Sequence, residues 1–293
     1  LQNGLVPVFI DVGEGDYNLR VDLLERCVSA RTRAVMFAHT LGNPADLDAV
    51  GEFCARHGYF LIEDCCDALG ATWNGRPVGG FGDFATLSFY PSHHISMGEG
   101  GFVGAADPED ATILRSLRDW GRACFCEGRQ TLLENGGCKQ RYSRWLEDIE
   151  VPVDHKYVYS EIGYNLKPLE LQAAIGLAQV KRLPGIVQAR RANFARYHEF
   201  FLRHEEFFVL PSWDARARPS WFSYPLMVRP DAPFRRLELV QYLERRRIQT
   251  RSLFAGNLLR HPGYRDIPHR VVGELTVADR VLTDAFFIGV YPG

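Results

Sequence analysis

Two acid–base side chains and one hydroxyl stand next to apolar runs of this chain. Asp64 and Ser88 each close such a run, and His93 follows Ser88 by five residues. A carboxylate can keep a pyridine nitrogen protonated, a hydroxyl at a turn suits a phosphate, and an imidazole exchanges protons near neutral pH. Taken alone, Asp64 equally suits a turn cap, Ser88 a structural hydroxyl, and either His93 or its neighbour His94 a hydrogen-bonded structural histidine.

Four of the seven cysteines form a second candidate group, spaced Cys66-x57-Cys124-x-Cys126-x11-Cys138. Four thiolates suit zinc or an iron–sulfur cluster. The Cys-x-Cys spacing is shorter than that of an ordinary zinc knuckle, and the first cysteine lies next to Asp64, where an electron carrier would be close to the chemistry. Cys65 competes with Cys66 as the first ligand.

Composition excludes several classes of protein. The 293 residues carry a net charge of −2 and no basic stripe, so nucleic acid is not an expected partner. No apolar stretch reaches the length of a membrane span, and the first residues do not form a signal peptide. Cys27 and Cys54 fall in helical patterns and are expected to be buried, reduced thiols, which favours a cytoplasmic protein. The chain neither starts with Met nor ends on a helix, so we expect a fragment of a longer protein.

Strand and helix patterns alternate along the first part of the chain. Apolar runs bounded by turn residues predict strands over residues 6–12, 34–39, 59–63, 84–90 and 101–105. Helical spacing predicts helices over residues 45–57 and 108–121, the second with Asp107 as its N-cap. This alternation favours a doubly wound α/β sheet, in which ligands bind beyond the carboxyl ends of the strands, and Asp64 lies at such an end.

The rest of the chain follows other patterns. Residues 122–160 are polar and without a clear period, which indicates an inserted loop that bears three cysteines. Residues 168–204 predict one or two long helices, interrupted near Pro184. Strand patterns over 221–228 and 248–253 flank a helical pattern over 235–246. We therefore expect a large domain over residues 1–180, and a connecting helix with a small domain over residues 181–293.

Several segments resemble, in order and spacing, those of the DegT/DnrJ/EryC1/StrS aminotransferases. They are Glu63-Asp64-Cys65-Cys66-Asp67-Ala68-Leu69-Gly70-Ala71, Phe81-Gly82-Asp83, the run Ser88–Gly101, and the segment from Gly163-Tyr164-Asn165 to Gly176. The resemblance implies the type I fold of pyridoxal phosphate (PLP) dependent transferases. This fold has a mixed, mostly parallel sheet flanked by helices and a smaller C-terminal α+β domain. It also implies that the N-terminal part of the large domain is missing.

The resemblance implies a role for each matching position. Asp64 would pair with the pyridine nitrogen, and Ser88 would bind the phosphate. Asn165 would reach a phosphate in the neighbouring subunit, which implies a homodimer with shared active sites. Asp67 stands where the family usually has Gln or His, and would contact the ring hydroxyl. His93 occupies the position of the lysine that anchors PLP, and because imidazole cannot form that imine, it favours proton chemistry on pyridoxamine phosphate (PMP).

The cysteine spacing is similar to that of the CDP-4-keto-6-deoxyglucose-3-dehydrase branch of this family, which uses PMP and a [2Fe-2S] cluster. That branch has seven residues before the fourth cysteine, whereas this chain has eleven, so we infer an insertion within residues 129–135. The branch implies ligation by Cys66, Cys124, Cys126 and Cys138. It further implies C-3 deoxygenation of a nucleotide-linked 4-keto-6-deoxyhexose, with electrons from a flavin iron–sulfur reductase, in O-antigen (lipopolysaccharide) or antibiotic sugar pathways.

Other functions stay open on these residues. A cluster-free, glutamate-dependent 3-dehydratase of the same family would lack a use for the four cysteines. An ordinary nucleotide-sugar aminotransferase would need the lysine that His93 replaces. An inactive scaffold of the same fold would not need Asp64, Ser88 and Asn165. Arg251 suits a phosphate or carboxylate contact and, equally, a surface salt bridge.

Overall fold

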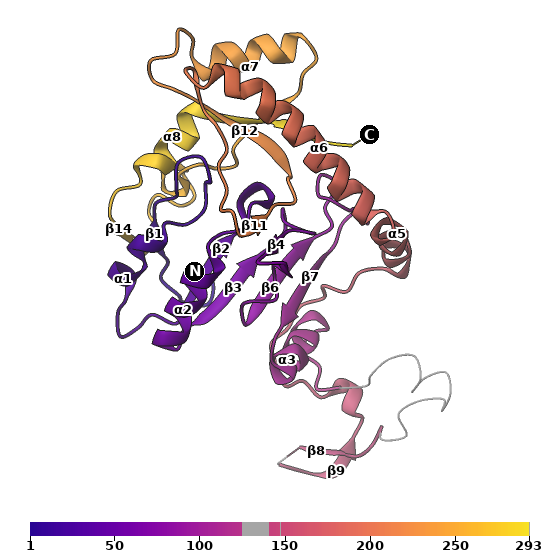
Figure 1. The fold of residues 1–293 in the computed structure, drawn as a ribbon. Helices are drawn as coiled ribbons and strands as arrows, with labels where there is room; N and C mark the ends of the chain where they lie inside the picture. Colours follow the sequence, from indigo (N-terminus) through magenta and orange to yellow (C-terminus); the bar gives the residue numbers. More distant parts are fainter. Residues whose placement is uncertain (125–140, 147, 293) are drawn as a thin grey trace. The chain divides into compact units, whose positions relative to one another are not determined.

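The computed structural model describes residues 1–124, 141–146 and 148–292. The chain divides into two compact units, one made of Leu1–Phe102 with Ala174–Gly293 and the other of Val103–Ala173. Figure 1 gives the order of the elements along the chain. The helices are α1 (Leu24–Cys27), α2 (Leu47–His57), α3 (Pro108–Arg118), α5 (Glu170–Val180), α6 (Leu183–Phe201), α7 (Arg236–Arg245) and α8 (Thr276–Asp284), together with short 3-10 turns.

The strands are short. They are β1 (Val8–Ile10), β2 (Ala34–Ala38), β3 (Phe60–Asp64), β4 (Thr72–Trp73), β5 (Arg76–Pro77), β6 (Phe84–Ser88), β7 (Gly101–Ala105), β8 (Arg144–Leu146), β9 (Ile149–Val153), β10 (Phe208–Val209), β11 (Ala217–Arg218), β12 (Ser223–Val228), β13 (Thr250–Ser252), β14 (Arg270–Val272) and β15 (Ala285–Gly289).

A four-stranded sheet carries the candidate chemistry. Its order is β2-β3-β6-β7, and β3 runs parallel to both β2 and β6. The α2 crossover begins where the Asp46 side chain accepts a hydrogen bond from the Ala49 amide and ends at Gly58, whose left-handed φ of 65° stops the helix. Val50 and Phe53 of α2 belong to the core on this sheet. The predicted mixed, mostly parallel α/β architecture is confirmed.

A second, antiparallel sheet forms the C-terminal part of the larger unit. Its order is β10-β12-β15-β13, and all residues of β12 are buried. Helix α6 packs against β12, where the rings of Phe194 and Trp221 stack with centroids 3.8 Å apart. Tyr224 and Phe286 complete this aromatic core. The α+β character expected for the C-terminal residues is confirmed, whereas the boundary between residues 180 and 181 stays a prediction.

Two segments differ from expectation. The predicted strand over residues 6–12 shortens to β1, which pairs with β14 rather than with the main sheet. A three-residue apolar run does not determine its partner, which here lies more than 260 residues away in the chain. Part of the predicted loop over residues 122–160 forms the antiparallel hairpin β8–β9. Its strands have three and five residues, and β9 contains Pro152, so the sequence pattern of this segment did not indicate strands.

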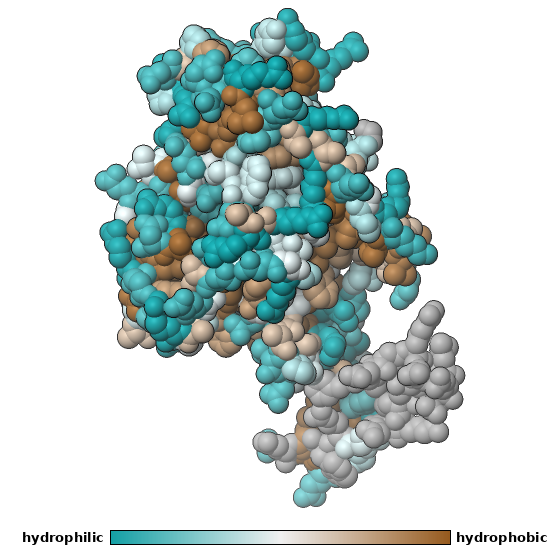
Figure 2. All heavy atoms as spheres, in the orientation of Figure 1, coloured by the Kyte–Doolittle hydropathy of each residue, from teal (hydrophilic) through white to brown (hydrophobic). Residues whose placement is uncertain are grey.

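Helix α5 has an unusual surface. None of its residues is buried, although its sequence is mostly apolar, and its Leu171 and Leu177 side chains are 72% and 69% exposed. Apolar spheres gather over this helix in Figure 2. Among the described residues, no helix combines the length and the apolar character needed to cross a membrane.

Candidate active site

The ends of two neighbouring strands form the frame of the site. Asp64 is the last residue of β3, and its register partner on β6 is Thr86, two residues before Ser88. Asp64 Oδ1 accepts a hydrogen bond of 3.0 Å from the Cys66 amide, so the carboxylate caps the turn after β3 while Oδ2 lies outside this bond. Ser88 Oγ accepts from the Tyr90 amide over 3.2 Å. Asp64 and Ser88 therefore both accept a hydrogen bond from the turn that follows their strand, and both side chains lie at the same edge of the sheet.

His93 and Asp67 face each other at this edge. The two atoms His93 Nε2 and Asp67 Oδ1 lie 3.3 Å apart, and both side chains are about 15% exposed. His93 Nδ1 is enclosed and has no hydrogen-bond partner among the residues that the structure describes. A proton exchanged with a ligand therefore has to pass through Nε2, the ring atom beside the carboxylate. A carboxylate beside an imidazole can hold the orientation of its ring.

Aromatic rings enclose the same imidazole. The ring of Tyr90 lies 5.9 Å from that of His93, and the ring of Phe222 lies 5.6 Å away. The His93 amide donates to the Tyr90 carbonyl over 3.0 Å, which holds the loop in a tight turn. Sequence reasoning missed Phe222, because it lies 129 residues further along the chain and nothing local marks it.

His94 lies in a different environment from its neighbour. It is buried, and its Nε2 lies 3.0 Å from the carbonyl oxygen of Ser220 and 2.9 Å from Ser220 Oγ. Because the carbonyl can only accept, Nε2 carries the proton. Burial, with the nearby charge of Arg190, lowers the pKa of His94 to about 3. His94 is therefore neutral near pH 7 and held as a structural residue, which favours His93 as the base.

The two adjacent cysteines after β3 differ in environment. The Cys65 side chain is buried against Ala68 and Ala71, and burial raises the pKa of its thiol. Cys66 is partly buried, and its Sγ lies 3.8 Å from Thr86 Oγ1 on β6. Burial and the neighbouring Asp64 raise the pKa of Cys66 to about 12, so a bound cation would be needed to hold its thiolate. The greater exposure favours Cys66 over Cys65 as a ligand.

Two further predicted residues, Cys124 and Asn165, belong to the smaller unit. Cys124 is partly buried there. Its neighbour Ala123 donates from its amide to the Val158 carbonyl over 2.8 Å. Cys126 and Cys138 lie outside the described residues. Asn165 is exposed, and its Oδ1 accepts a hydrogen bond of 2.7 Å from Lys167 Nζ.

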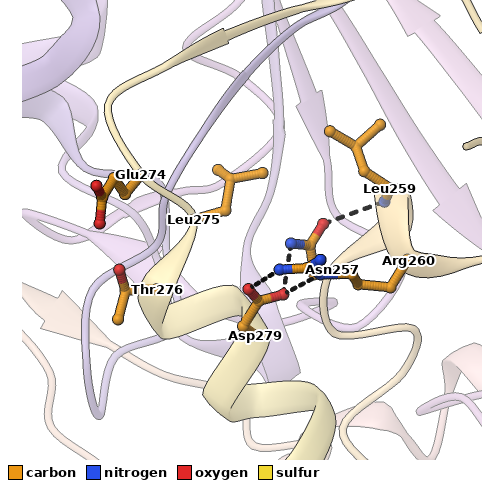
Figure 3. A pocket seen from close by; sticks show the side chains of 7 residues that line it. All are labelled: Asn257, Leu259, Arg260, Glu274, Leu275, Thr276 and Asp279. Atoms are coloured by element: carbon orange, nitrogen blue, oxygen red, sulfur yellow. Dashed lines mark hydrogen bonds and ion pairs between the residues drawn. The ribbon is translucent and has the colours of Figure 1, made fainter.

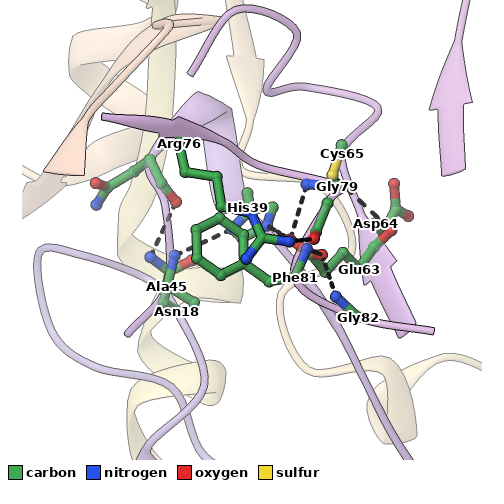
Figure 4. Close-up of polar contacts among 12 residues, drawn as sticks. Asn18, His39, Ala45, Glu63, Asp64, Cys65, Arg76, Gly79, Phe81 and Gly82 are labelled. Atoms are coloured by element: carbon green, nitrogen blue, oxygen red, sulfur yellow. Dashed lines mark hydrogen bonds and ion pairs between the residues drawn. The ribbon is translucent and has the colours of Figure 1, made fainter. Parts of the chain in front are cut away.

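A buried His39–Glu63 pair, which sequence reasoning missed, supports β3 from its other face (Figure 4). Glu63 Oε1 accepts from the amides of Phe81 and Gly82, both over 2.7 Å. Its Oε2 accepts from the Gly79 amide over 2.8 Å and from His39 Nε2 over 3.1 Å. Burial alone would raise the pKa of Glu63, but the hydrogen bonds from His39, Gly79 and Gly82 outweigh it and lower the pKa.

His39, Glu63 and Cys65 form the one group of three metal-ligating side chains found among the described residues. His39 Nδ1 accepts from the Ala45 amide over 3.1 Å, so the proton of this imidazole sits on Nε2 and points at Glu63. Four donors already occupy the Glu63 carboxylate. A metal would have to displace them, so we assign these residues to holding the loop that follows β5. A second acidic residue directly before Asp64, at the end of a mostly apolar strand, was the sequence signal for this role.

Two surface pockets lie in the C-terminal part of the chain. The first, of about 410 Å³, is lined by Asn257, Leu259, Arg260, Glu274, Leu275, Thr276 and Asp279 (Figure 3). Asp279 there accepts from Asn257 Nδ2 over 2.7 Å and from Arg260 Nε over 2.8 Å, so its charge is compensated. The second, of about 320 Å³, includes Arg236 and Arg251. Arg251 is exposed, and its Nη1 donates to the Thr250 carbonyl over 2.9 Å.

The chain is similar to known sugar-modifying proteins. It is 45% identical over 293 residues to the lipopolysaccharide biosynthesis protein RfbH of Salmonella typhimurium, and 45% identical over 293 residues to the dTDP-4-dehydro-2,6-dideoxy-D-glucose 3-dehydratase of Saccharopolyspora spinosa. These matches cover 100% of this chain but 66% and 62% of the two relatives. The chain therefore spans about two thirds of the length of the curated relatives it matches.

A solved structure and a family pattern agree with these relatives. The structure of E. coli GDP-4-keto-6-deoxy-D-mannose-3-dehydratase with bound hydrated PLP superimposes with a TM-score of 0.85 at 26% identity. The match covers 100% of this chain and 72% of that one. It confirms the predicted type I transferase fold. The sequence pattern of the DegT/DnrJ/EryC1/StrS aminotransferase family matches residues 1–293, and the chain belongs to this family.

Proposed function

We propose that this chain is the catalytic part of a PMP-dependent 3-dehydratase that acts on a nucleotide-linked 4-keto-6-deoxyhexose. One observation carries the proposal: His93 Nε2 lies 3.3 Å from Asp67 Oδ1 at the strand ends. The family resemblance implies that His93 stands where an aminotransferase has the lysine that anchors PLP. Relatives at 45% identity include a protein named as a sugar 3-dehydratase. The solved structure with bound PLP is also named as one.

The residues present suit the cofactor. Asp64 offers a carboxylate at the end of β3 for a pyridine nitrogen, and Ser88 offers a hydroxyl at the end of β6 for a phosphate. When bound, PMP supplies an amine that can join the sugar ketone and a ring that accepts electrons. Asn165 stays a predicted phosphate contact from the neighbouring subunit. Arg251 stays a candidate contact for a substrate anion.

Proton transfer is the task that falls to the chain's own groups. His93 takes a proton at Nε2 and can return it to the departing C-3 hydroxyl, since one imidazole serves as base and then as acid. Asp67, 3.3 Å from Nε2, keeps the ring oriented. The rings of Tyr90 and Phe222 limit the access of water to this exchange.

The proposal is tested with a nucleotide-linked 4-keto-6-deoxyhexose, PMP and a chemical reductant, with loss of the C-3 oxygen followed by mass spectrometry. His93→Asn keeps a polar side chain but cannot exchange protons, and we expect a loss of about 10² to 10⁴ in rate. Asp67→Asn leaves a base in place and should reduce the rate less. Tyr242→Phe, on the exposed face of α7, is the control. Equal rates in His93→Asn and the wild type would refute the assignment.

We further propose that Cys66, Cys124, Cys126 and Cys138 hold a [2Fe-2S] cluster that passes single electrons from a flavin iron–sulfur reductase. The cysteine spacing supports this, as does the preference of thiolates for iron. The alternative is a cluster-free dehydratase that regenerates PMP with glutamate. This proposal and the cytoplasmic location both remain predictions.

The content of iron and acid-labile sulfide distinguishes the cluster-containing enzyme from the cluster-free alternative. Anaerobically purified protein should contain two irons and two sulfides per chain and give an EPR signal on reduction. Cys124→Ser should lose both iron and sulfide. Cys27→Ser is the control, because the Cys27 thiol bonds to the Leu23 carbonyl and is not a proposed ligand, and this variant should retain both. Absence of iron after reconstitution, with activity that depends on glutamate, would favour the cluster-free alternative.

A homodimer is the assembly we propose, with α5 at its interface. The large apolar side chains of α5 are all exposed, which is unfavourable in water, and a second copy would cover them. Leu171→Glu with Leu177→Glu should convert a dimer to a monomer in light-scattering measurements. Leu237→Glu, at an equally exposed position on α7, should not. An unchanged mass for the double variant would exclude this interface.

A further inference from the structure

A short segment of residues 219–222 connects β11 to β12 and crosses the candidate site; we call it the crossing segment. Its Ser220 amide donates to the Gly42 carbonyl over 2.9 Å, and Ser220 Oγ donates to the Leu69 carbonyl over 2.8 Å. The segment is therefore held between the turn after β2 and the turn after β3. It is a fixed part of the site rather than a free loop.

Phe222 at the end of this segment contacts the proposed base. Its ring lies 5.6 Å from the His93 ring and is tilted by 53°. The guanidinium of Arg190, from α6, lies 6.0 Å from the centroid of the same ring. Phe222 thus has His93 and Arg190 as neighbours, and a shift of Phe222 would change the space available to His93.

Arg190 is buried in a way that needs an explanation. It is 3% exposed, its Nη1 donates to the carbonyls of Phe222 over 2.8 Å and Trp221 over 3.4 Å, and its Nε has no partner. The charge is not paired with a carboxylate within the part of the chain that the structure describes; Asp67 acts on it at longer range. Such burial is expensive, and an apolar side chain of similar length would avoid it.

Departures from local stability rules concentrate at functional sites. Arg190 is such a departure, because its charge is buried, and its shorter hydrogen bond ends on Phe222, whose ring lies against His93. Arg191, the next residue on α6, has a different role: it is only partly buried and bonds to the Pro219 carbonyl at the far end of the crossing segment.

We propose that Arg190 is a positioning residue for proton transfer at His93: it holds Phe222 against the imidazole and keeps a positive charge near Asp67. The proposal rests on the proposed function in that His93 is taken as the base. Arg190 itself touches neither ligand nor reacting atoms. Its effect should therefore be on the rate of the chemical step rather than on substrate binding.

The test compares Arg190→Met, Arg190→Lys and the exposed control Arg196→Met on the same helix. A small displacement of a catalytic group lowers the rate of the chemical step strongly. We therefore expect Arg190→Met to lower kcat about tenfold to a hundredfold, while KM stays within about twofold of the wild-type value. Arg190→Lys, which keeps the charge and one donor, should recover part of kcat. In a double-mutant cycle, Arg190→Met should have a smaller effect when Phe222 is already Leu.

The proposal is checked by two measurements, the kinetics of the variants and the NMR signals of His93. The ring signals of labelled His93 in NMR spectra should shift in Arg190→Met and not in Arg196→Met, and this holds whether or not the protein shows dehydratase activity. If Arg190→Met fails to fold, the Lys variant and the Phe222→Leu background carry the comparison. Full kcat in both Arg190 variants, unshifted His93 signals, or additive effects with Phe222→Leu would each overturn the proposal.

Discussion

Acid sensitivity of the fold follows from the burial of His94. Its pKa is about 3 in the folded chain against an ordinary value of 6.5, because burial and the charge of Arg190 disfavour the imidazolium. Below pH 6.5 the unfolded chain binds a proton that the folded chain does not. The contribution of His94 to stability is therefore fully present above pH 6.5 and is lost progressively as the pH falls toward 3.

The magnitude follows from the same two values. One pKa unit corresponds to 1.36 kcal/mol, so between pH 7 and pH 5 the wild type should lose about 2 kcal/mol of unfolding free energy through this residue. This window lies above the pH range over which the contribution of Glu63 to stability changes. Because the pKa of Glu63 is lowered, the stability it adds is lost only as the pH falls below its ordinary value of 4.5.

His94→Asn is the perturbation that isolates this term. The amide can still donate to the Ser220 carbonyl but does not titrate. The unfolding free energy, measured in urea at pH 7, 6 and 5, should therefore fall between pH 7 and pH 5 by about 2 kcal/mol less in the variant than in the wild type. His269→Asn, at an exposed position, should leave the pH dependence unchanged. Parallel pH curves for His94→Asn and the wild type would refute the account of His94 as a buried, neutral residue.

Two further predictions concern the frame of the site. Glu63→Gln places two donors among the amides that now donate to the carboxylate, and should lower the unfolding free energy by about 3 kcal/mol in urea titrations at pH 7; stability equal to the wild type would contradict the four hydrogen bonds. Gly42→Ala should destabilise by more than about 2 kcal/mol, because Gly42 has φ +85° and a Cβ there would lie 1.8 Å from the Ser220 carbonyl oxygen. Gly51→Ala, in α2 with no atom within 4 Å of the added Cβ, is its control and should stabilise by about 0.5 to 1 kcal/mol in the same assay.

Local features of the sequence determine the elements and the strand ends. Alternating apolar and helical patterns place β3, β6 and α2 within two residues of their predicted bounds. Asp107 caps α3 as its position before a proline indicates. Because ligands bind at the carboxyl ends of parallel strands, these bounds were enough to bring Asp64 and Ser88 to one edge of the sheet.

Only the tertiary structure decides which side chains meet there. The contact between His93 and Asp67 depends on how two loops fold over the strand ends. The contact between His93 and Phe222 depends on the crossing segment reaching the site from the distant C-terminal part of the chain. His93 and His94 are adjacent and chemically alike in the sequence, yet one lies beside a carboxylate and the other is buried on the Ser220 carbonyl. Burial and long-range packing set these environments, and they do not follow from a residue's local pattern.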